Sequence, residues 1–275
     1  MPKFLGVDLK WAVLAAAGLS FVVLAGIVLR PRFHIEHAGA RYLALSSAQT
    51  VASNLDTHLD GLKDLLSGIS VAVSTNPDDR DANDVLLRRI QSELPKSIAN
   101  IFVLTLDGSN IGNAVGNHAH AGDREYFKRA LAGDRVVVGV PIRSRSDLGW
   151  VIPVAQPVFD SSGKLRVVLT IAIFTDSLRE LIGTYELPKG AVVRVVTEDG
   201  IEIALFSSQT TAIEPDDSRM GSPARQFRLT EGSEVVNLHS NLTRIVGFSR
   251  TQRAPWLVTV GLPVDGRPAS GAKLP

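Results

Sequence analysis

The sequence predicts an α+β protein with an N-terminal transmembrane helix, a long helix behind it, and two units built on antiparallel sheets. Three observations lead to this prediction. An uncharged run fills residues 11–29, a helical stripe of apolar residues covers 33–74, and two similar strand–turn–strand segments recur about ninety residues apart. Strands joined by hairpins, with helices between them, favour antiparallel sheets over a doubly wound parallel sheet.

Composition excludes several classes of function. The 275 residues carry a formal net charge of +1 and contain no cysteine. Without cysteine there can be no disulfide, no thiolate nucleophile and no Cys-ligated zinc. The basic residues are scattered rather than gathered into a stripe, so no nucleic-acid partner is expected. We also expect no cofactor.

The uncharged run at residues 11–29 is long enough to cross a bilayer as a helix, which takes about 20 residues. A cleaved signal peptide is the alternative, but its apolar core is shorter and a small-residue cleavage site follows it. Here Arg30, Pro31 and Arg32 follow, which favours an uncleaved anchor. Basic residues lie on both sides, so charge does not decide the orientation. We expect residues 1–10 to be a cytoplasmic tail, because a short tail before a long domain is typical of a signal anchor.

Apolar residues recur at steps of three and four from Ile35 to Val73, with Tyr42 in the series. This spacing predicts a long helix over residues 33–74. Two interpretations stay open. The helix packs along its own domain, or it is a stalk that also pairs with a second copy and forms a homodimer.

The rest of the chain divides into two sheet-containing units, 75–184 and 185–263, followed by a tail, 264–275. Each unit begins its sheet with a hairpin around an Asp-Gly turn, IANIFVLTLDGSNIGNA in the first and AVVRVVTEDGIEIAL in the second. Before the first hairpin, Asp84 is predicted to cap a short helix over residues 85–94.

The order of these segments resembles a known family. Behind the anchor and long helix come DREYFKRALAG, PVFDSSGKLRVVLTIAI and VGFSRTQRAPWLVTVGLP. This order is similar to that of the double Cache sensor domains of bacteria, which are PAS-like folds, and the resemblance covers about residues 35–263. It implies a single-pass protein of the bacterial inner membrane with a periplasmic or extracellular sensor domain. Such domains serve chemoreceptors, sensor histidine kinases and diguanylate cyclases, and the membrane-distal unit, here 75–184, usually holds the ligand.

The motif DREYF supplies the first candidate ligand-binding residues, Arg124, Tyr126 and Phe127. The resemblance implies that amino-acid-binding members use an arginine and two aromatic residues there. A guanidinium can hold a carboxylate through two hydrogen bonds, and aromatic rings exclude water from it. In the alternative interpretation, Arg124 pairs with Asp123 or Glu125 at the surface and both aromatic residues belong to the core.

Two departures from the family pattern bear on the ligand. Amino-acid-binding members place an aspartate where this sequence has Ala172 and a further tyrosine where it has Ile142. Without those partners, a buried ammonium group would lie unpaired at a cost of several kcal/mol. The sequence therefore predicts a small organic anion such as a carboxylate, rather than a free amino acid; an apolar molecule stays open.

Three further residues are candidates for ligand contact. His118 and His120 lie in the segment just before DREYF, and Arg143 lies on the strand after it. Two imidazoles so spaced could also serve a metal, but no cysteine accompanies them, and we expect no metal site. Arg143, together with Arg145, extends the positive rim or simply faces solvent on an edge strand.

These observations predict a membrane-anchored sensor that binds a small molecule, and not an enzyme. One alternative is a structural or dimerisation subunit of the same fold without a ligand. Another is an anchored hydrolase using His118 or His120, although the sequence contains no G-x-S-x-G, H-E-x-x-H or P-loop motif. No output domain is recognisable, so we expect either that the chain is part of a longer product or that it signals through a partner protein.

Overall fold

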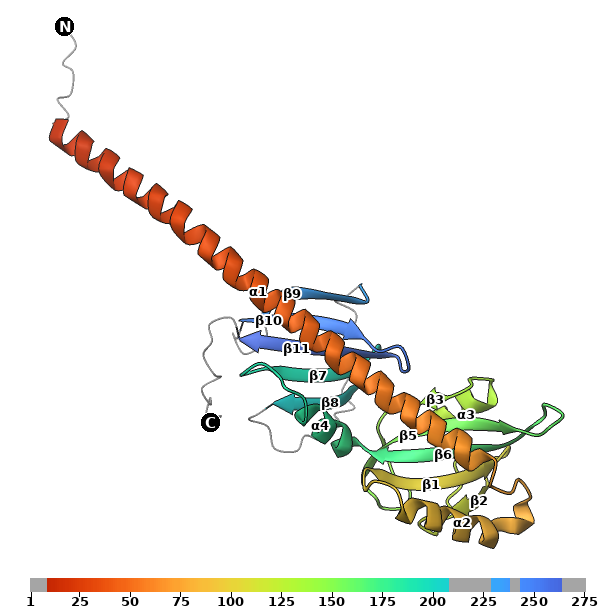
Figure 1. The fold of residues 1–275 in the computed structure, drawn as a ribbon. Coiled ribbons are helices and arrows are strands. Elements are labelled where there is room, and N and C mark those ends of the chain that lie inside the picture. Colours follow the sequence, from red (N-terminus) through yellow and green to blue (C-terminus); the bar gives the residue numbers. More distant parts are fainter. Residues whose placement is uncertain (1–8, 208–228, 238–242, 264–275) are drawn as a thin grey trace.

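The computed structural model describes residues 9–207, 229–237 and 243–263, with the side chains of 9–37 left aside (Figure 1). One long helix and two antiparallel sheets make up this part of the chain. The predicted α+β class, the long helix and the two sheets are thus confirmed. The predicted tails, 1–10 and 264–275, lie almost wholly outside the described residues.

Helix α1 runs without interruption from Leu9 to Ser70. It covers the predicted span, 11–29, and the long helix predicted over 33–74 except for the last four residues. Among the residues searched in the described part, no helix is both long and apolar enough to cross a membrane. The span at 11–29 falls where side chains are not described.

The first sheet has the strand order β2-β1-β6-β5-β3, with β4 also paired to β5, and every pair is antiparallel. Its strands are β1 (Ile98–Thr105), β2 (Asn110–Asn113), β3 (Val137–Val138), β4 (Ile142–Arg143), β5 (Trp150–Phe159) and β6 (Leu165–Phe174). The accompanying helices are the short η1 (Pro77–Asp79), α2 (Arg80–Ser92), α3 (Glu125–Leu131) and α4 (Thr175–Gly183).

The second sheet has the order β8-β7-β11-β10-β9 and is also antiparallel throughout. Its strands are β7 (Val192–Thr197), β8 (Glu202–Ser207), β9 (Glu231–Asn237), β10 (Thr243–Arg250) and β11 (Trp256–Pro263). Both predicted Asp-Gly hairpins are present, as β1–β2 and β7–β8.

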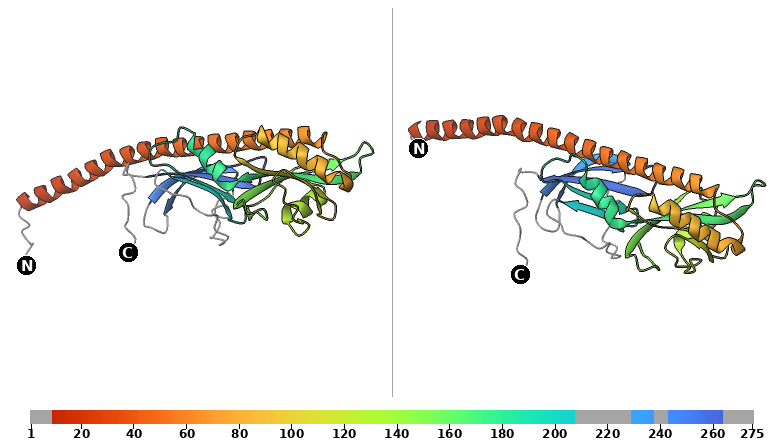
Figure 2. Two further views of the ribbon diagram at one scale, coloured as in Figure 1. Left: turned by 90° about the horizontal axis from the view of Figure 1, so that it is seen from below. Right: turned by 60° about the horizontal axis from the view of Figure 1, so that its bottom comes forward.

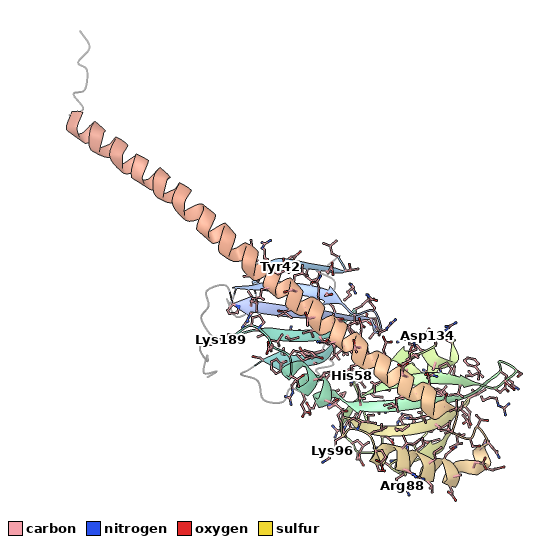
Figure 3. All side chains as sticks on the ribbon, viewed as in Figure 1. Tyr42, His58, Arg88, Lys96, Asp134 and Lys189 are labelled. Atoms are coloured by element: carbon pink, nitrogen blue, oxygen red, sulfur yellow. The ribbon has the colours of Figure 1, made fainter. Side chains whose placement is uncertain are left out.

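Helix α1 lies along the same side of both sheets, and its N-terminal turns extend beyond the second sheet (Figures 1 and 2). In Figure 3 the labels mark its course, with Tyr42 beside the second sheet and His58 near the point where the two sheets meet. Buried residues of α1 join strands of both sheets in one core. The interpretation of a helix packed along its own domain is therefore confirmed; pairing with a second copy stays a prediction.

Alternation along the strands gives the first sheet two different faces. On β1, Ile101 and Val103 belong to the core shared with α1, whereas Phe102 and Leu104 pack with α3. Figure 2 shows α1 and α3 on opposite sides of this sheet. The face that carries α3 is also the face that holds the candidate site.

Near its middle, α1 comes into direct backbone contact with β10. A Cβ atom at Gly247 would lie 2.1 Å from the carbonyl carbon of Ala44, so only glycine allows this approach. Ala44 is fully buried while Tyr42 is 75% exposed. The predicted stripe is wrong at Tyr42, because Ala44 faces the sheet and a residue two positions away points to the other side of a helix.

The predicted capping role of Asp84 is also wrong. Helix α2 begins four residues earlier, at Arg80, after the single turn of η1. Asp84 therefore lies inside the helix and is buried, where it accepts a hydrogen bond from the backbone N–H of Asn113 at 2.7 Å. The aspartate ties α2 to β2 rather than beginning the helix.

We predict that Gly247→Ala destabilises the protein by about 1–3 kcal/mol, since the helix must move away from the sheet to admit the methyl group. Urea unfolding followed by circular dichroism measures the change. Gly61→Ala is the matched control on the exposed side of α1, where a Cβ meets nothing within 4 Å. It should stabilise the helix by about 0.5–1 kcal/mol. Equal effects of the two substitutions would contradict the close contact.

Candidate functional site

A cavity lies on the face of the first sheet that is turned away from α1. It contains about 500 Å³ of empty space, part of it open to solvent, and is bounded by the sheet, the segment before α3, and the β4–β5 hairpin. Among the described residues that line it, the apolar ones are Phe102, Ala119, Ala121, Ile142, Val151, Pro153 and Ala172.

The floor of the cavity is a row of paired strand residues. Asn100 on β1 lies opposite Ala172 on β6, which in turn lies opposite Pro153 on β5. Two of these three side chains are small or apolar and carry no hydrogen-bonding group. Within this row, only the Asn100 amide can form hydrogen bonds.

Two glycines fix the segment that leads into α3. In the Asp-Gly turn, Gly108 has a φ of 89°, and a Cβ there would lie 2.3 Å from the backbone nitrogen of Gly122. The N–H of Ala121 donates to the carbonyl of Gly108 at 2.9 Å. The turn and the segment thus pack backbone against backbone, which sets where α3 begins.

The side chains at the start of α3 face the cavity in part. Arg124 is the residue that precedes the helix, and Tyr126 is buried in its first turn. Both line the cavity. Burial raises the pKa of Tyr126 to about 12, so its hydroxyl stays protonated and can donate a hydrogen bond.

The β4–β5 hairpin is bound to the segment before α3 by one arginine. Arg145 makes two hydrogen bonds to the Asp123 carboxylate, at 2.9 and 2.6 Å, and a third to the carbonyl of His120. Asn117 donates to the carbonyl of Arg145 at 3.0 Å. This fork-like pairing holds the hairpin against the mouth of the cavity.

Arg124 and Arg143 differ from Arg145 in having no carboxylate partner within the described part of the chain. The Arg124 guanidinium donates one hydrogen bond, from Nη2 to the carbonyl of Arg143 at 3.1 Å. The ion pair expected in the alternative interpretation is absent, since Asp123 is engaged by Arg145. No acidic residue is among the described residues that line the cavity, so its charge is positive.

The other predicted site residues lie elsewhere. Phe127 is buried beneath α3 against the sheet and does not line the cavity. His118 lies 3.0 Å from the Asp84 carboxylate of α2, and His120 accepts the N–H of Gly122 through Nδ1. The cavity thus brings together Arg124, Tyr126 and Arg143 but not these three. Among the described residues, no group of three His, Asp or Glu side chains could hold a metal.

Four asparagines that line the cavity were missed by sequence reasoning. They are Asn100, Asn110, Asn113 and Asn117, which come from β1, β2 and the following segment. Asparagine is depleted in strands, so four of them within residues 100–117 were a signal of a polar site.

The sequence matches the family model of the Cache domain over residues 36–266. The chain belongs to the Cache domain family. This match covers both sheets and the part of α1 that packs on them, and it confirms the resemblance seen in the order of the motifs.

Several solved structures share this Cache fold. The extracellular domain of rpHK1S-Z16 is 22% identical, with a TM-score of 0.63 over 84% of this chain and 97% of that one. The ligand-binding domain of the Pseudomonas aeruginosa PAO1 amino acid chemoreceptor PctC, in complex with GABA, is 19% identical, with a TM-score of 0.59 over 80% and 98%. That of the Pseudomonas fluorescens chemoreceptor CtaA, in complex with L-isoleucine, is 16% identical, with a TM-score of 0.64 over 86% and 95%. No curated protein matches the chain.

The Asp123–Arg145 pair of this Cache domain yields a prediction on pH. The hydrogen bonds from Arg145 lower the pKa of Asp123 from 3.8 to about 2. A lowered pKa means that the pair is intact above pH 3.8 and is lost as the pH falls through about 2. In Arg145→Gln, the pKa of Asp123 should return toward 3.8, as measured by NMR of the carboxyl carbons.

Asp160 is the internal control for this titration. Its pKa is lowered first by a hydrogen bond from the Ser162 side chain, in a turn that Arg145 does not reach. Asp160 should have the same pKa in the unaltered protein and in Arg145→Gln. An unchanged pKa of Asp123 in Arg145→Gln would show that the pair does not hold the hairpin in solution.

Proposed function

We propose that the chain is the extracytoplasmic sensor domain of a membrane-anchored receptor, and that its cavity binds a small organic anion. One observation carries the proposal. Two arginines, Arg124 and Arg143, line the cavity and have no carboxylate partner in the described part of the chain, and no acidic residue is among its described lining. A ligand carboxylate would supply the missing partner through the forked hydrogen bonds that guanidinium groups favour.

The same lining argues against a free amino acid. Amino acids are the ligands named for the chemoreceptors PctB and CtaA. In this chain the positions where the family resemblance implies an aspartate and a tyrosine hold Ala172 and Ile142, and both side chains line the cavity. An ammonium group there would lose its hydration without gaining a countercharge. An anion without an ammonium group fits the charges better.

Membrane attachment completes this proposal. Residues 11–29 would cross the inner membrane of a bacterium, with 1–10 inside the cell and the two sheets outside. Since α1 reaches the second sheet before the first (Figure 1), the unit 185–263 would lie near the membrane and the unit 75–184 away from it. Occupancy of the cavity would then act on α1 through the first sheet and be passed to an output domain or a signalling partner.

A homodimer formed through α1 is part of the proposal. The side of α1 turned away from the second sheet exposes Tyr42 at 75% and Leu43 at 45% of their surface. Exposed apolar side chains on a long helix suit pairing with a second copy. The same surface would serve a purely structural subunit, which is the second candidate function. Ligand binding distinguishes the two.

We predict that short-chain carboxylates raise the melting temperature of the protein and that Arg124→Ala abolishes this rise. The reason is that the substitution removes the guanidinium group that would pair with the carboxylate. Differential scanning fluorimetry over a panel of carboxylates, amines and sugars measures the effect.

Arg129→Ala is the matched control, because Arg129 lies on the same helix but pairs with Asp134 at the surface, away from the cavity. It should retain the shift. A panel without any shift would favour the structural subunit, and an unchanged shift in Arg124→Ala would remove the assignment of the anion site to this cavity.

A further inference from the structure

The side-chain oxygen of Asn100 has no hydrogen-bonding partner, although the residue is almost completely buried. Its exposed fraction is 4%, and its Oδ1 atom is fully enclosed without a donor. Three other buried polar atoms share this condition in the described part of the chain, on Gln91, Trp150 and Thr170. Of the four residues, only Asn100 lines the cavity.

The sheet explains why Asn100 cannot find a partner within the protein. Its neighbours Ala99 and Ile101 are apolar, and across the sheet it faces Ala172 and then Pro153. None of these side chains carries a hydrogen-bond donor. A buried amide without a partner is destabilising, and native proteins satisfy such groups with few exceptions. Because Asn100 lines the cavity, a ligand bound there can supply the donor that Oδ1 lacks.

We infer that Asn100 recognises an uncharged group of the ligand that both donates and accepts a hydrogen bond, namely a hydroxyl or a carboxamide. This inference rests on the proposed function, in which Arg124 and Arg143 hold a carboxylate. The ligand is thus a short carboxylic acid with a second, neutral polar group. Its O–H or N–H donates to Oδ1 of Asn100, and its oxygen accepts from Nδ2.

Other groups at this position are less suitable. A methyl group would leave the Asn100 amide unsatisfied and would bury it further. An ammonium group needs several acceptors and a countercharge, and the amide supplies one neutral acceptor. The walls beside Asn100 are apolar, formed by Phe102, Val151 and Ile142. They suit the short carbon chain that would join the two polar ends of the ligand.

Isothermal titration of the full chain with matched acids tests the inference. The probes are propionate, lactate, alanine and succinamate, which differ in the group that would face Asn100. We expect lactate or succinamate to bind about tenfold more tightly than propionate, since one hydrogen bond to an otherwise unsatisfied buried group has about that value. Alanine should bind more weakly than lactate.

Substitution of Asn100 should remove the preference for lactate and succinamate over propionate and leave the binding of propionate nearly unchanged. In Asn100→Leu, lactate and succinamate should fall to the affinity of propionate, which should itself change little. Asn54→Leu, on α1 outside the cavity, is the matched control and should retain the preference. If Asn100→Leu fails to fold, Asn100→Asp keeps the shape of the side chain, and its carboxylate should reverse the order so that alanine binds more tightly than lactate.

The outcomes separate the inference from the proposed function. Equal affinity for propionate, lactate and succinamate would overturn the role of Asn100 and leave the anion site intact. Tighter binding of alanine than of lactate by the unaltered protein would overturn the neutral-group assignment. Absence of binding by all four probes would remove the proposed function and the inference with it.

Discussion

The burial of one continuous helix against two sheets is the constraint on which the rest of this structure depends. At Gly247 the backbones of α1 and β10 meet so closely that no side chain fits between them. Asp56 accepts hydrogen bonds from the turn between β10 and β11, and Ser67 bonds to Gln156 of β5 in the first sheet. Protein interiors are densely packed and yield little. A displacement of α1 against one sheet must therefore be accommodated at the other.

The first sheet separates the cavity from α1 by the thickness of one strand layer, and its alternating side chains serve both sides. Asn100 faces the cavity, while the next residue, Ile101, is buried in the core shared with α1. Successive residues of a strand cannot move independently, because the pleat fixes their directions. A ligand that forms hydrogen bonds with Asn100 would thus act on a strand whose opposite face contacts the helix. The same reasoning explains why the site can be polar on one face of the sheet without weakening the core on the other.

Local patterns in the sequence were sufficient for the fold and for part of the site. Hairpin turns and helical spacing are short-range signals, and so is the motif that contains Arg124 and Tyr126. The errors arose where a distant segment decides the outcome. Tyr42 lies outside the buried face of α1, which includes Ala44 in contact with a glycine on β10 some two hundred residues later. A distant partner also appears at His118, which lies 3.1 Å from Asp84, 34 residues away, while its contact with a ligand stays a prediction. Asn100 escaped notice because its isolation depends on strand register, which the sequence does not state.

In the proposed function, the residues that line the cavity would have two tasks: attracting an anion and distinguishing one anion from another. Arg145 is neutralised by Asp123 and holds the hairpin in position, so it adds structure rather than net charge. In the proposed function, Arg124 and Arg143 would supply the attraction, but guanidinium groups bind many carboxylates alike. Discrimination would have to come from neutral groups that form a hydrogen bond with one ligand and not with another. A buried amide left unsatisfied changes the relative affinity of two similar ligands more than an added methylene does. In the proposed function, a cavity lined by asparagines and arginines would therefore select among anions as well as attract them.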